Sequence, residues 1–375
     1  MEGDTLFMKM IKGLLMVSAL LLTGCSGTKS DYVGVTDGQG RQVTFDGNKV
    51  SRVICIGAGA LRFYSYIGDI KNVIAVEEID SSTTFGVGDA LRPYYLANKD
   101  SFGLLPIIGK GGPMAQVADK EKIVAANPDI IVSFLSKDAN DELERDTKIP
   151  VIGLSQGPQG VYDEITQQSF RVLGTVFKKD DRATSLINYI EDSKESFKDL
   201  TETTETYYAG CIGNWGKTNL YGTFNNWPVF NTAKVKPAIK ALDITDKGQI
   251  TIDAEKLTAI NPDKIFVDTA GIGGFLTDYK ANPTKYDALK AFTTGETYQV
   301  LPYNAYYTNL EIQLMSTYFV ASVAHPESFE NFSIEDKCNE ISEKFLGKQL
   351  YNDMKAHPNG MGGYKKINIK DLLGE

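Results

Sequence analysis

Arginine and tyrosine side chains stand directly after several predicted strands, which is where an α/β protein binds its ligands. Arg62 and Arg92 are two of only seven arginines in the chain, and Tyr94 and Tyr95 follow Arg92 closely. A guanidinium beside a helix N-terminus suits carboxylate, catecholate or phosphate groups. Tyrosine offers a flat apolar face and a hydroxyl that can bind ferric iron or accept hydrogen bonds. Each tyrosine can equally well be explained as a residue that packs in the core. Arg62 can equally well be explained as one partner of a surface ion pair.

The full set of candidate ligand residues follows from one rule. Each member comes directly after a predicted strand or at the start of the helix that follows it, because ligands in open α/β sheets sit beyond the carboxyl ends of the strands. The predicted ligand-binding residues are Gly59, Arg62, Glu77, Arg92, Tyr94, Tyr95, Gly111, Trp215, Tyr221, Asn225, Trp227, Tyr303, Tyr306, Tyr307 and Asn309.

Metal and catalytic chemistry are not expected from the residues of the chain itself. The two histidines, His325 and His357, lie outside these loops, so a histidine cluster for bare zinc or manganese is not predicted. The sequence contains no Walker motif, Ser/His/Asp constellation or Cys/His pairing. We therefore predict no catalytic residue, no metal ligand and no cofactor. An iron or cobalt ion would arrive inside an organic chelate, as cargo.

One pattern in the sequence is typical of an enzyme that binds a dinucleotide. Gly57 and Gly59 follow a predicted strand and open a helix, and Glu77 lies 20 residues beyond Gly57, as in a dinucleotide-binding fingerprint. Arg62 occupies the place of the third glycine, however, and a nicotinamide cofactor would be scarce outside the membrane. An enzyme is therefore the weaker interpretation.

These residues are positioned by strands that alternate with helices through both halves of the chain. Residues 33–45 alternate apolar and polar side chains around a turn and predict a β-hairpin. Thr308 and Glu311 fit a capping box that opens a helix to Ala324. The further predicted strands are 53–56, 73–76, 106–108, 130–134, 151–154, 207–212, 265–267 and 298–301. This alternation predicts an α/β fold of two lobes with mostly parallel central sheets.

An internal repeat supports the division into two lobes. Residues 119–129 align without gaps on residues 253–263, each as a short helix that stops at Asn-Pro-Asp and runs into an apolar strand. Asn-Pro-Asp alone is a common way to end a helix. Because both copies also begin with Asp-x-Glu-Lys, duplication is the better interpretation.

A long helix is predicted over 180–204, between the two halves. Its apolar residues recur at spacings of three, four and seven, with Lys, Asp and Glu in most other positions. At a rise of about 1.5 Å per residue, roughly 25 residues reach about 37 Å, enough to cross two small domains. An ordinary surface helix explains the pattern equally well. The predicted organisation is a signal peptide at 1–25, an N-terminal lobe at 26–178, an interlobe helix at 179–205 and a C-terminal lobe at 206–375.

The first 25 residues predict export. Lys9 and Lys12 precede a short apolar run over 14–22, which is shorter than a transmembrane helix needs. The run ends in Leu-Thr-Gly-Cys, which resembles the bacterial lipobox, and Cys25 would then carry the diacyl (palmitate-type) lipid. A plain secretory signal with a chance cysteine is the alternative. The net charge of -9 argues against a nucleic-acid surface.

Together these features resemble the bacterial ABC-transporter solute-binding lipoproteins that have a rigid interlobe helix and carry ferric siderophores, haem or cobalamin. The specific pieces are the lipobox, both Asn-Pro-Asp units and the segments 35–43, 109–113 and 301–311. The resemblance implies two lobes with a ligand cleft between them and a long helix that limits their movement. Arg62 stands where most of the family has glutamate, which leaves the ligand subclass open.

The resemblance also gives two glutamates a role in docking. In the cobalamin-binding member, the permease-docking glutamates lie just before the Pro-Asp-strand unit of each lobe, and Glu121 and Glu255 match those places. Two glutamates at equivalent places in similar lobes can face arginines of a two-fold permease dimer. Each exposed pair contributes only about 0–1 kcal/mol, so the pairs would set register and encounter rate more than affinity. A solvated glutamate in a first helical turn is the alternative.

The sequence therefore predicts a monomeric lipoprotein, anchored to the cell membrane on its extracytoplasmic face. It would capture a ferric siderophore or similar metal chelate and deliver it to an ABC permease dimer with its ATPase. The expected partners are this permease, the small-molecule chelate and the membrane through the N-terminal lipid, with no nucleic acid. The alternatives are a binding protein for a corrinoid, haem or an oxyanion, or a lipid-anchored sensor or adhesin on the same fold.

Overall fold

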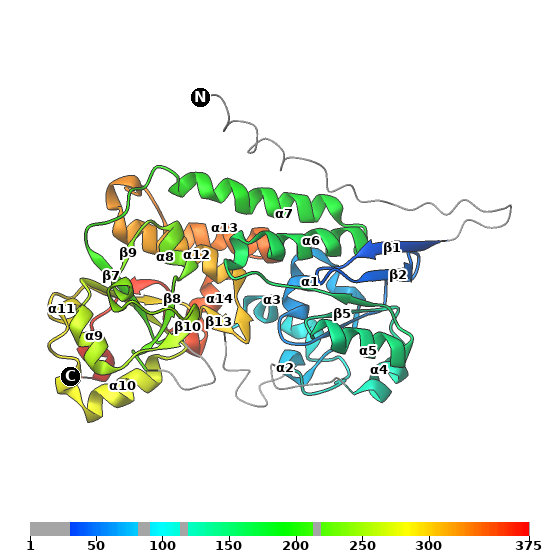
Figure 1. The fold of residues 1–375 in the computed structure, drawn as a ribbon, viewed down its shortest axis with the longest axis horizontal. Coiled ribbons are helices and arrows are strands. Elements are labelled where there is room, and N and C mark those ends of the chain that lie inside the picture. The colour runs from blue at the N-terminus through cyan, green and yellow to red at the C-terminus, as the bar shows by residue number, and fades with distance from the viewer. Residues whose placement is uncertain (1–30, 82–90, 113–118, 213–218, 375) are drawn as a thin grey trace, which may run out of the picture.

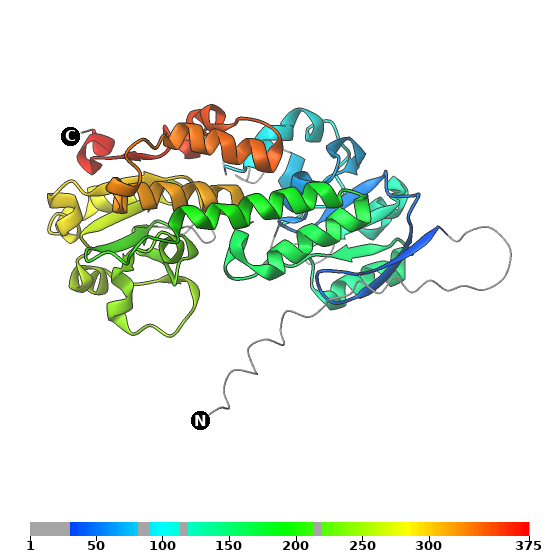
Figure 2. The same ribbon diagram turned by 90° about the horizontal axis from the view of Figure 1, so that it is seen from above.

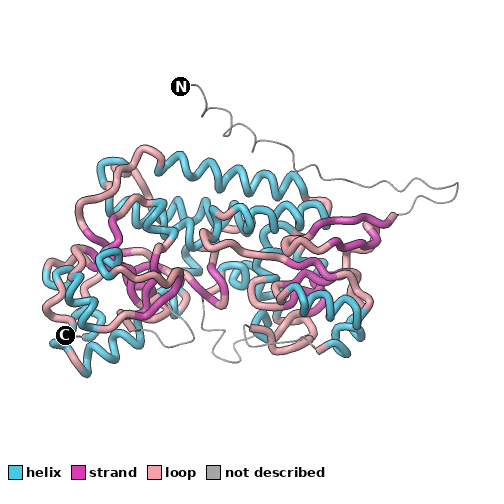
Figure 3. Tube along the Cα trace, viewed as in Figure 1, coloured by secondary structure: helices cyan, strands magenta, loops and turns pink. Residues whose placement is uncertain are grey.

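A computed structural model describes residues 31–81, 91–112, 119–212 and 219–374, arranged as two α/β lobes (Figure 1). The first sheet has the order β4-β3-β5-β6, and all of its strands are parallel. The second has the order β15-β12-β11-β7-β9 and is parallel except for its edge strand β15. In each lobe, helices surround the strands (Figure 3). The predicted fold class is confirmed.

The strands of the two main sheets lie on either side of the chain midpoint. The first sheet contains β3 (Val53–Ile56), β4 (Val73–Ala75), β5 (Ile130–Ser133) and β6 (Val151–Gly153). The second contains β7 (Thr206–Gly210), β9 (Lys236–Pro237), β11 (Lys264–Asp268), β12 (Thr297–Val300) and β15 (Lys365–Lys366). Among the described residues, three antiparallel strand pairs accompany them: β1 (Tyr32–Thr36) with β2 (Gln42–Asp46), β8 (Gly222–Asn225) with β10 (Gly248–Thr251), and β13 (Asn304–Ala305) with β14 (Tyr307–Thr308).

Helices follow most strands, as the alternating pattern predicts. Before the chain midpoint they are α1 (Ala60–Ile67), α2 (Glu78–Ser81), α3 (Pro93–Phe102), α4 (Lys120–Ala126), α5 (Lys137–Thr147), α6 (Glu164–Phe177) and α7 (Asp180–Ser193). After it they are α8 (Pro228–Thr232), α9 (Ala254–Ile260), α10 (Ile272–Ala281), α11 (Lys290–Thr293), α12 (Leu310–Ala324), α13 (Ile334–Leu346), α14 (Tyr351–Ala356) and α15 (Ile369–Leu373).

The internal repeat is present in the structure as well as in the sequence. The side chains of Asp119 and Asp253 cap α4 and α9 by accepting a backbone hydrogen bond three residues on, and each helix ends at an asparagine in the left-handed conformation. The aspartate of each Asn-Pro-Asp then binds the start of the lobe's first sheet strand. Asp129 accepts from the backbone of Arg52 at 2.9 Å, and Asp263 accepts from that of Thr206 at 2.7 Å.

The helix between the lobes is shorter than the sequence predicts. The α-helix α7 ends at Ser193, and a 3₁₀ segment continues only to Phe197, not to residue 204. The Ser193 hydroxyl donates to the carbonyl of Ile190 at 2.6 Å, a local bond of the kind that competes with helical geometry. The predicted apolar stripe is nevertheless buried at Ala183, Leu186, Ile187, Ile190 and Phe197. Figure 2 shows α7 running along the molecule from one lobe toward the other.

Helix α12 lies deeper than α7 and joins the lobes. It is buried around most of its circumference, which agrees with its apolar sequence. Gln313 on this helix donates to the carbonyl of Gln159 at 2.9 Å and accepts from the backbone of Val161 at 3.0 Å, both in the N-terminal lobe. Val53 of the first sheet and Phe266 of the second belong to one continuous core. The lobes are therefore joined by packing as well as by the chain.

The predicted capping box at the start of α12 is wrong. Asn309, rather than Thr308, precedes the first helical residue, and no side chain caps the helix. Glu311 is fully buried and instead accepts a hydrogen bond from the Tyr66 hydroxyl at 2.7 Å. Because Tyr66 belongs to α1, the glutamate serves contact between the lobes.

Candidate functional site

The hairpin β13–β14 of the C-terminal lobe reaches the carboxyl ends of the N-terminal strands, and Figure 1 shows β13 between the two lobes. Arg62 on α1 holds it there. Its guanidinium donates to the carbonyls of Ala305 at 2.8 Å and Thr308 at 3.2 Å, and the side chain is almost fully buried. The expected surface ion pair of Arg62 is therefore absent among the described residues, and the guanidinium binds backbone of the opposite lobe.

Tyr306 and Tyr307 form the tip of this hairpin and remain partly exposed, at 40% and 37%. Tyr307 lies against Gly59, whose added Cβ would come within 3.3 Å of its ring, and its centroid is 5.3 Å from that of Phe134 after β5. The Tyr306 ring lies close to Gly112, at 3.6 Å from where a Cβ would be. The hairpin thus presents two aromatic rings where the two lobes meet.

A buried group of charges lies behind these rings. Arg92 donates to the carbonyl of Ile79 and lies 3.7 Å from Asp80, whose carboxylate accepts from the Tyr94 hydroxyl at 2.5 Å. The guanidinium also lies over the Tyr95 ring, 4.7 Å from its centroid. Among the described residues, Nε and Nη2 of Arg92 have no hydrogen-bond partner. This arginine therefore has donors to offer, unlike a saturated structural one.

Glu77 joins the two loops that border this group. Its Oε2 accepts from the backbone N–H of Gly57 at 2.9 Å, and the loop at Gly111 packs directly on its side chain. Burial, and then repulsion from Asp80, raise the pKa of Glu77 to about 8. The carboxyl is thus mostly protonated at neutral pH and can donate a hydrogen bond at the edge of the site.

The predicted residues of the C-terminal lobe are only partly brought to this place. Asn309 is buried and donates to the carbonyls of Leu91 and Pro302. Tyr303 and Trp227 pack against each other in the core, with centroids 5.4 Å apart. Tyr221 stacks on Tyr286, while Asn225 binds loop carbonyls of its own lobe. Trp215 lies outside the described residues, as does Cys25. Ligand contact by these residues stays a prediction.

Three buried carboxyl groups lie around the site, and two of them, Asp80 and Glu311, were not among the predicted residues. Asp80 contacts Arg92 and Tyr94, and Glu311 lies beneath Arg62 with its pKa raised by burial. Asp268 ends β11 and accepts from the backbone of Tyr303 at 2.8 Å, and burial raises its pKa to about 7. An acidic residue at the carboxyl end of an apolar strand identifies Asp268 from sequence. No comparable pattern identifies Glu311.

The two predicted docking glutamates occupy corresponding first turns and are exposed. Among the described residues, neither Glu121 nor Glu255 forms an ion pair. The adjacent lysines are engaged: Lys120 binds Glu142 and Asp146 on α5, and Lys256 binds its helix cap Asp253. Both glutamates are therefore available to an external cation.

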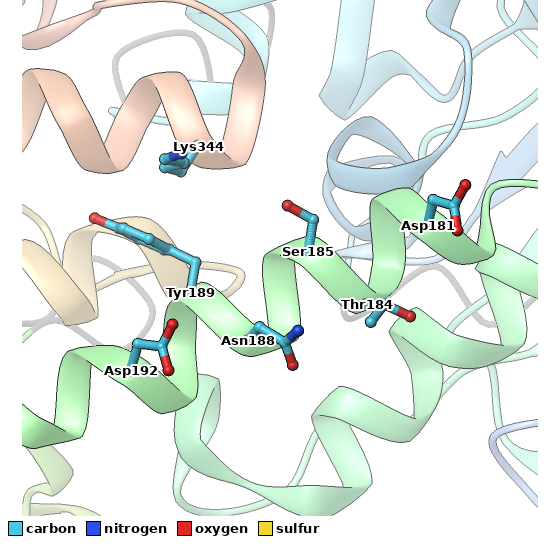
Figure 4. A pocket seen from close by; sticks show the side chains of 7 residues that line it. All are labelled: Asp181, Thr184, Ser185, Asn188, Tyr189, Asp192 and Lys344. Atoms are coloured by element: carbon cyan, nitrogen blue, oxygen red, sulfur yellow. The ribbon is translucent and has the colours of Figure 1, made fainter.

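A polar pocket lies away from these residues, between α7 and α13 (Figure 4). Its lining is Asp181, Thr184, Ser185, Asn188, Tyr189, Asp192 and Lys344. None of the predicted ligand residues belongs to it. Within the described part of the chain, no helix is both long enough and apolar enough to span a membrane.

Comparison with known proteins shows the family. A family model described as periplasmic binding protein matches residues 67–299, which is more than half of the chain. A search of curated protein sequences finds no match. Among solved structures, a periplasmic solute-binding protein from Veillonella parvula is similar, with a TM-score of 0.65 and 16% identity, over 88% of this chain and 99% of that one.

Two further structures are similar at low sequence identity. The molybdate periplasmic binding protein MolA of Haemophilus influenzae has a TM-score of 0.63 and 15% identity, over 84% of this chain and 98% of that one. The TroA-like periplasmic binding protein FepB from Veillonella parvula has a TM-score of 0.61 and 18% identity, over 84% and 97%. Likeness at this identity establishes the fold, and the family model establishes membership. The chain belongs to the periplasmic binding protein family of ABC-type solute-binding proteins, and it is a binding protein rather than an enzyme.

Proposed function

We propose that this protein captures a ferric siderophore or similar metal chelate outside the cell and delivers it to an ABC permease. The delivery step is supported by the two exposed, unpaired glutamates, Glu121 and Glu255, at corresponding places of a duplicated unit. The equivalent placement of the two glutamates is the observation that carries the proposal, because a two-fold permease would present the same cationic surface to both lobes. The N-terminal lipid on Cys25 would hold the protein at the membrane.

The chelate is supported by the chemistry at the meeting of the lobes. The rings of Tyr306 and Tyr307 are partly exposed, and Nε and Nη2 of Arg92 have no hydrogen-bond partner among the described residues. Aromatic faces suit the organic part of a chelate, and guanidinium donors suit its negative charge. Iron or cobalt is then part of the cargo, and the chain itself holds no cofactor.

A second candidate cargo is a small oxyanion. Nε and Nη2 of Arg92 form a buried donor pair that would suit a tetrahedral anion better than it suits a neutral ligand. The structure of the Haemophilus influenzae relative contains bound molybdate. Titration calorimetry with molybdate and with a ferric chelate separates the two cargoes, because an oxyanion site would bind molybdate alone.

Native mass spectrometry of protein purified from its own host tests the cargo directly. We expect a bound species whose mass and isotope pattern match an organic metal chelate. A ligand-free protein, or one that carries only a sugar, would contradict the chelate proposal.

Charge reversal tests delivery. We expect the double variant Glu121→Arg/Glu255→Arg to abolish uptake and leave cargo affinity unchanged. The matched control is Glu327→Arg/Glu330→Arg, which makes the same change of net charge at exposed positions outside α4 and α9. If the docking variant still supports uptake, or if the control loses uptake equally, the assignment of these two glutamates is wrong.

A further inference from the structure

The backbone of Tyr306 is held in a conformation that tyrosine rarely adopts. Its φ is 71°, in the left-handed region, at the single residue between β13 and β14. Glycine or asparagine occupies such a tip at lower energetic cost, so a tyrosine there is an outlier that asks for a functional reason. The ring it carries is also one of the most exposed large apolar side chains among the described residues, at 40%.

Several contacts keep this strained tip in place. Arg62 binds the carbonyls on both sides of it, those of Ala305 and Thr308, across a sequence separation of more than 240 residues. Arg62 has no carboxylate within ion-pair distance among the described residues, although it is fully buried. A buried guanidinium is costly unless it is well bonded, so its use on two backbone carbonyls indicates that the position of the hairpin matters.

The Tyr306 ring lies beside the N-terminal lobe and stays partly exposed. Gly112, with φ of 88°, seats one edge of the Tyr306 ring, and Gly59 seats the neighbouring Tyr307. Because the residue under each ring is a glycine, both rings lie close to the backbone of the N-terminal lobe. The exposed part of Tyr306 is therefore a fixed aromatic surface at the meeting of the lobes.

We propose that Tyr306 is the residue that selects the cargo, and that Arg62 is the positioning residue that holds its ring. The inference rests on the proposed function and names the class of cargo: a molecule with a flat, unsaturated face, either an aromatic ring or a macrocycle, stacked on Tyr306. In this proposal Arg62 acts through the hairpin: its Nη1 and Nη2 donate to the carbonyls of Thr308 and Ala305, and its Nε is buried. An aliphatic chelate of the same charge would gain nothing from the ring.

Glycine at position 306 gives a clean test, because it removes the ring and relieves the backbone at once. In Tyr306→Gly, relief of the positive φ offsets part of the cost of losing the ring and of the greater freedom of the unfolded chain, and a denaturant titration of the variant separates a loss of folding from a loss of affinity. The full-length protein is titrated with four probes: haemin, a ferric tris-catecholate, a ferric aliphatic trihydroxamate and molybdate. We expect affinity for one of the two flat probes to fall about tenfold in Tyr306→Gly and to stay within about threefold in Tyr306→Phe.

Two further variants complete the test. Lys178→Gly relieves a comparable φ of 55° at the end of α6, far from the hairpin, and should leave all affinities unchanged. Arg62→Met should weaken binding of the flat probe and speed hydrogen exchange of the hairpin amides. If Arg62→Met does not fold, the Tyr306 variants decide the question alone.

The outcomes separate this inference from the function on which it rests. If the protein binds chelates and Tyr306→Gly binds the flat probe as tightly as the wild type, Tyr306 does not select cargo. If Tyr306→Gly weakens the aliphatic probe equally, the flat-face preference is wrong. If the wild type binds molybdate and none of the chelates, the proposed cargo fails together with the inference.

Discussion

Replacement of Glu77 by glutamine should remove a large pH dependence of stability. Glu77 is buried, and its carboxyl accepts from the Gly57 amide at 2.9 Å. Glutamine has nearly the same shape, and its carbonyl oxygen can keep this hydrogen bond. The substitution therefore changes the ionisation of the group and little else.

The sign and size of the effect follow from the pKa in the two states. Burial, with repulsion from Asp80, raises the pKa of Glu77 from 4.5 to about 8 on folding. Between these values the folded chain keeps a proton that the unfolded chain has lost, so the free energy of unfolding falls as pH rises. At about 1.36 kcal/mol per pKa unit, the loss from this group reaches roughly 4 kcal/mol by pH 8 and approaches about 5 kcal/mol only above it. Below pH 4.5 the carboxyl is protonated in both states and contributes nothing.

The assay compares the free energy of unfolding of wild type and Glu77→Gln at pH 5, 6.5 and 8, from urea titrations. The variant should gain about 4 kcal/mol on the wild type between pH 5 and 8. Hydrogen exchange of the β3 amides gives the same quantity for the N-terminal lobe if the lobes unfold separately. The control is Asp268→Asn in the other lobe, whose pKa is raised to about 7, so its gain should stop near pH 7. Parallel curves for wild type and Glu77→Gln from pH 5 to 8 would refute a neutral Glu77.

Three other predictions follow from the packing. Arg41→Met should lower the free energy of unfolding by about 3 kcal/mol, because Asp37 would keep its backbone donors but lose its buried cation. In the same denaturant titration, the exposed control Arg145→Met should lower it by less than about 0.5 kcal/mol. Gly111→Ala should lower the melting temperature, since its φ is 67° and the new Cβ would lie 2.7 Å from the Glu77 side chain; an unchanged value would contradict the loop geometry. Scattering curves with and without cargo should differ little, because α12 and the shared core join the lobes; a large compaction would show that the lobes close by a wide hinge.

Local sequence patterns were sufficient for the central strands and for the repeat, whereas the predicted strand 106–108 forms only a single bridge between Ile107 and Val76. The central strands β3, β5 and β11 are mostly apolar runs, and a parallel sheet covered on both faces requires such runs. The two Asn-Pro-Asp units were identified by spacing alone. Their aspartates bind the start of a strand that lies 77 or 57 residues away in the sequence, so the same contact is formed once in each lobe.

Local patterns do not show which residues serve a distant contact. Thr308 and Glu311 have the spacing of a capping box, yet Glu311 faces Tyr66 of the other lobe. Arg62 lies at a helix start, where an anion-binding role is expected, and its Nη1 and Nη2 donate to carbonyls of the hairpin. Trp227 follows a strand and carries a large ring, and it packs in the core.

The sequence by itself determined that there are two α/β lobes, where the strands end, and which glutamates occupy equivalent turns. It could do so because periodicity, caps and strand runs depend on neighbours within a few residues. Only the tertiary structure decided that α12, rather than the longer-looking helix α7, is the buried element between the lobes. It also decided that Arg62, Glu77, Asp80 and Tyr306 meet at one place. Their meeting depends on contacts between segments far apart in the chain, and no local pattern contains such contacts.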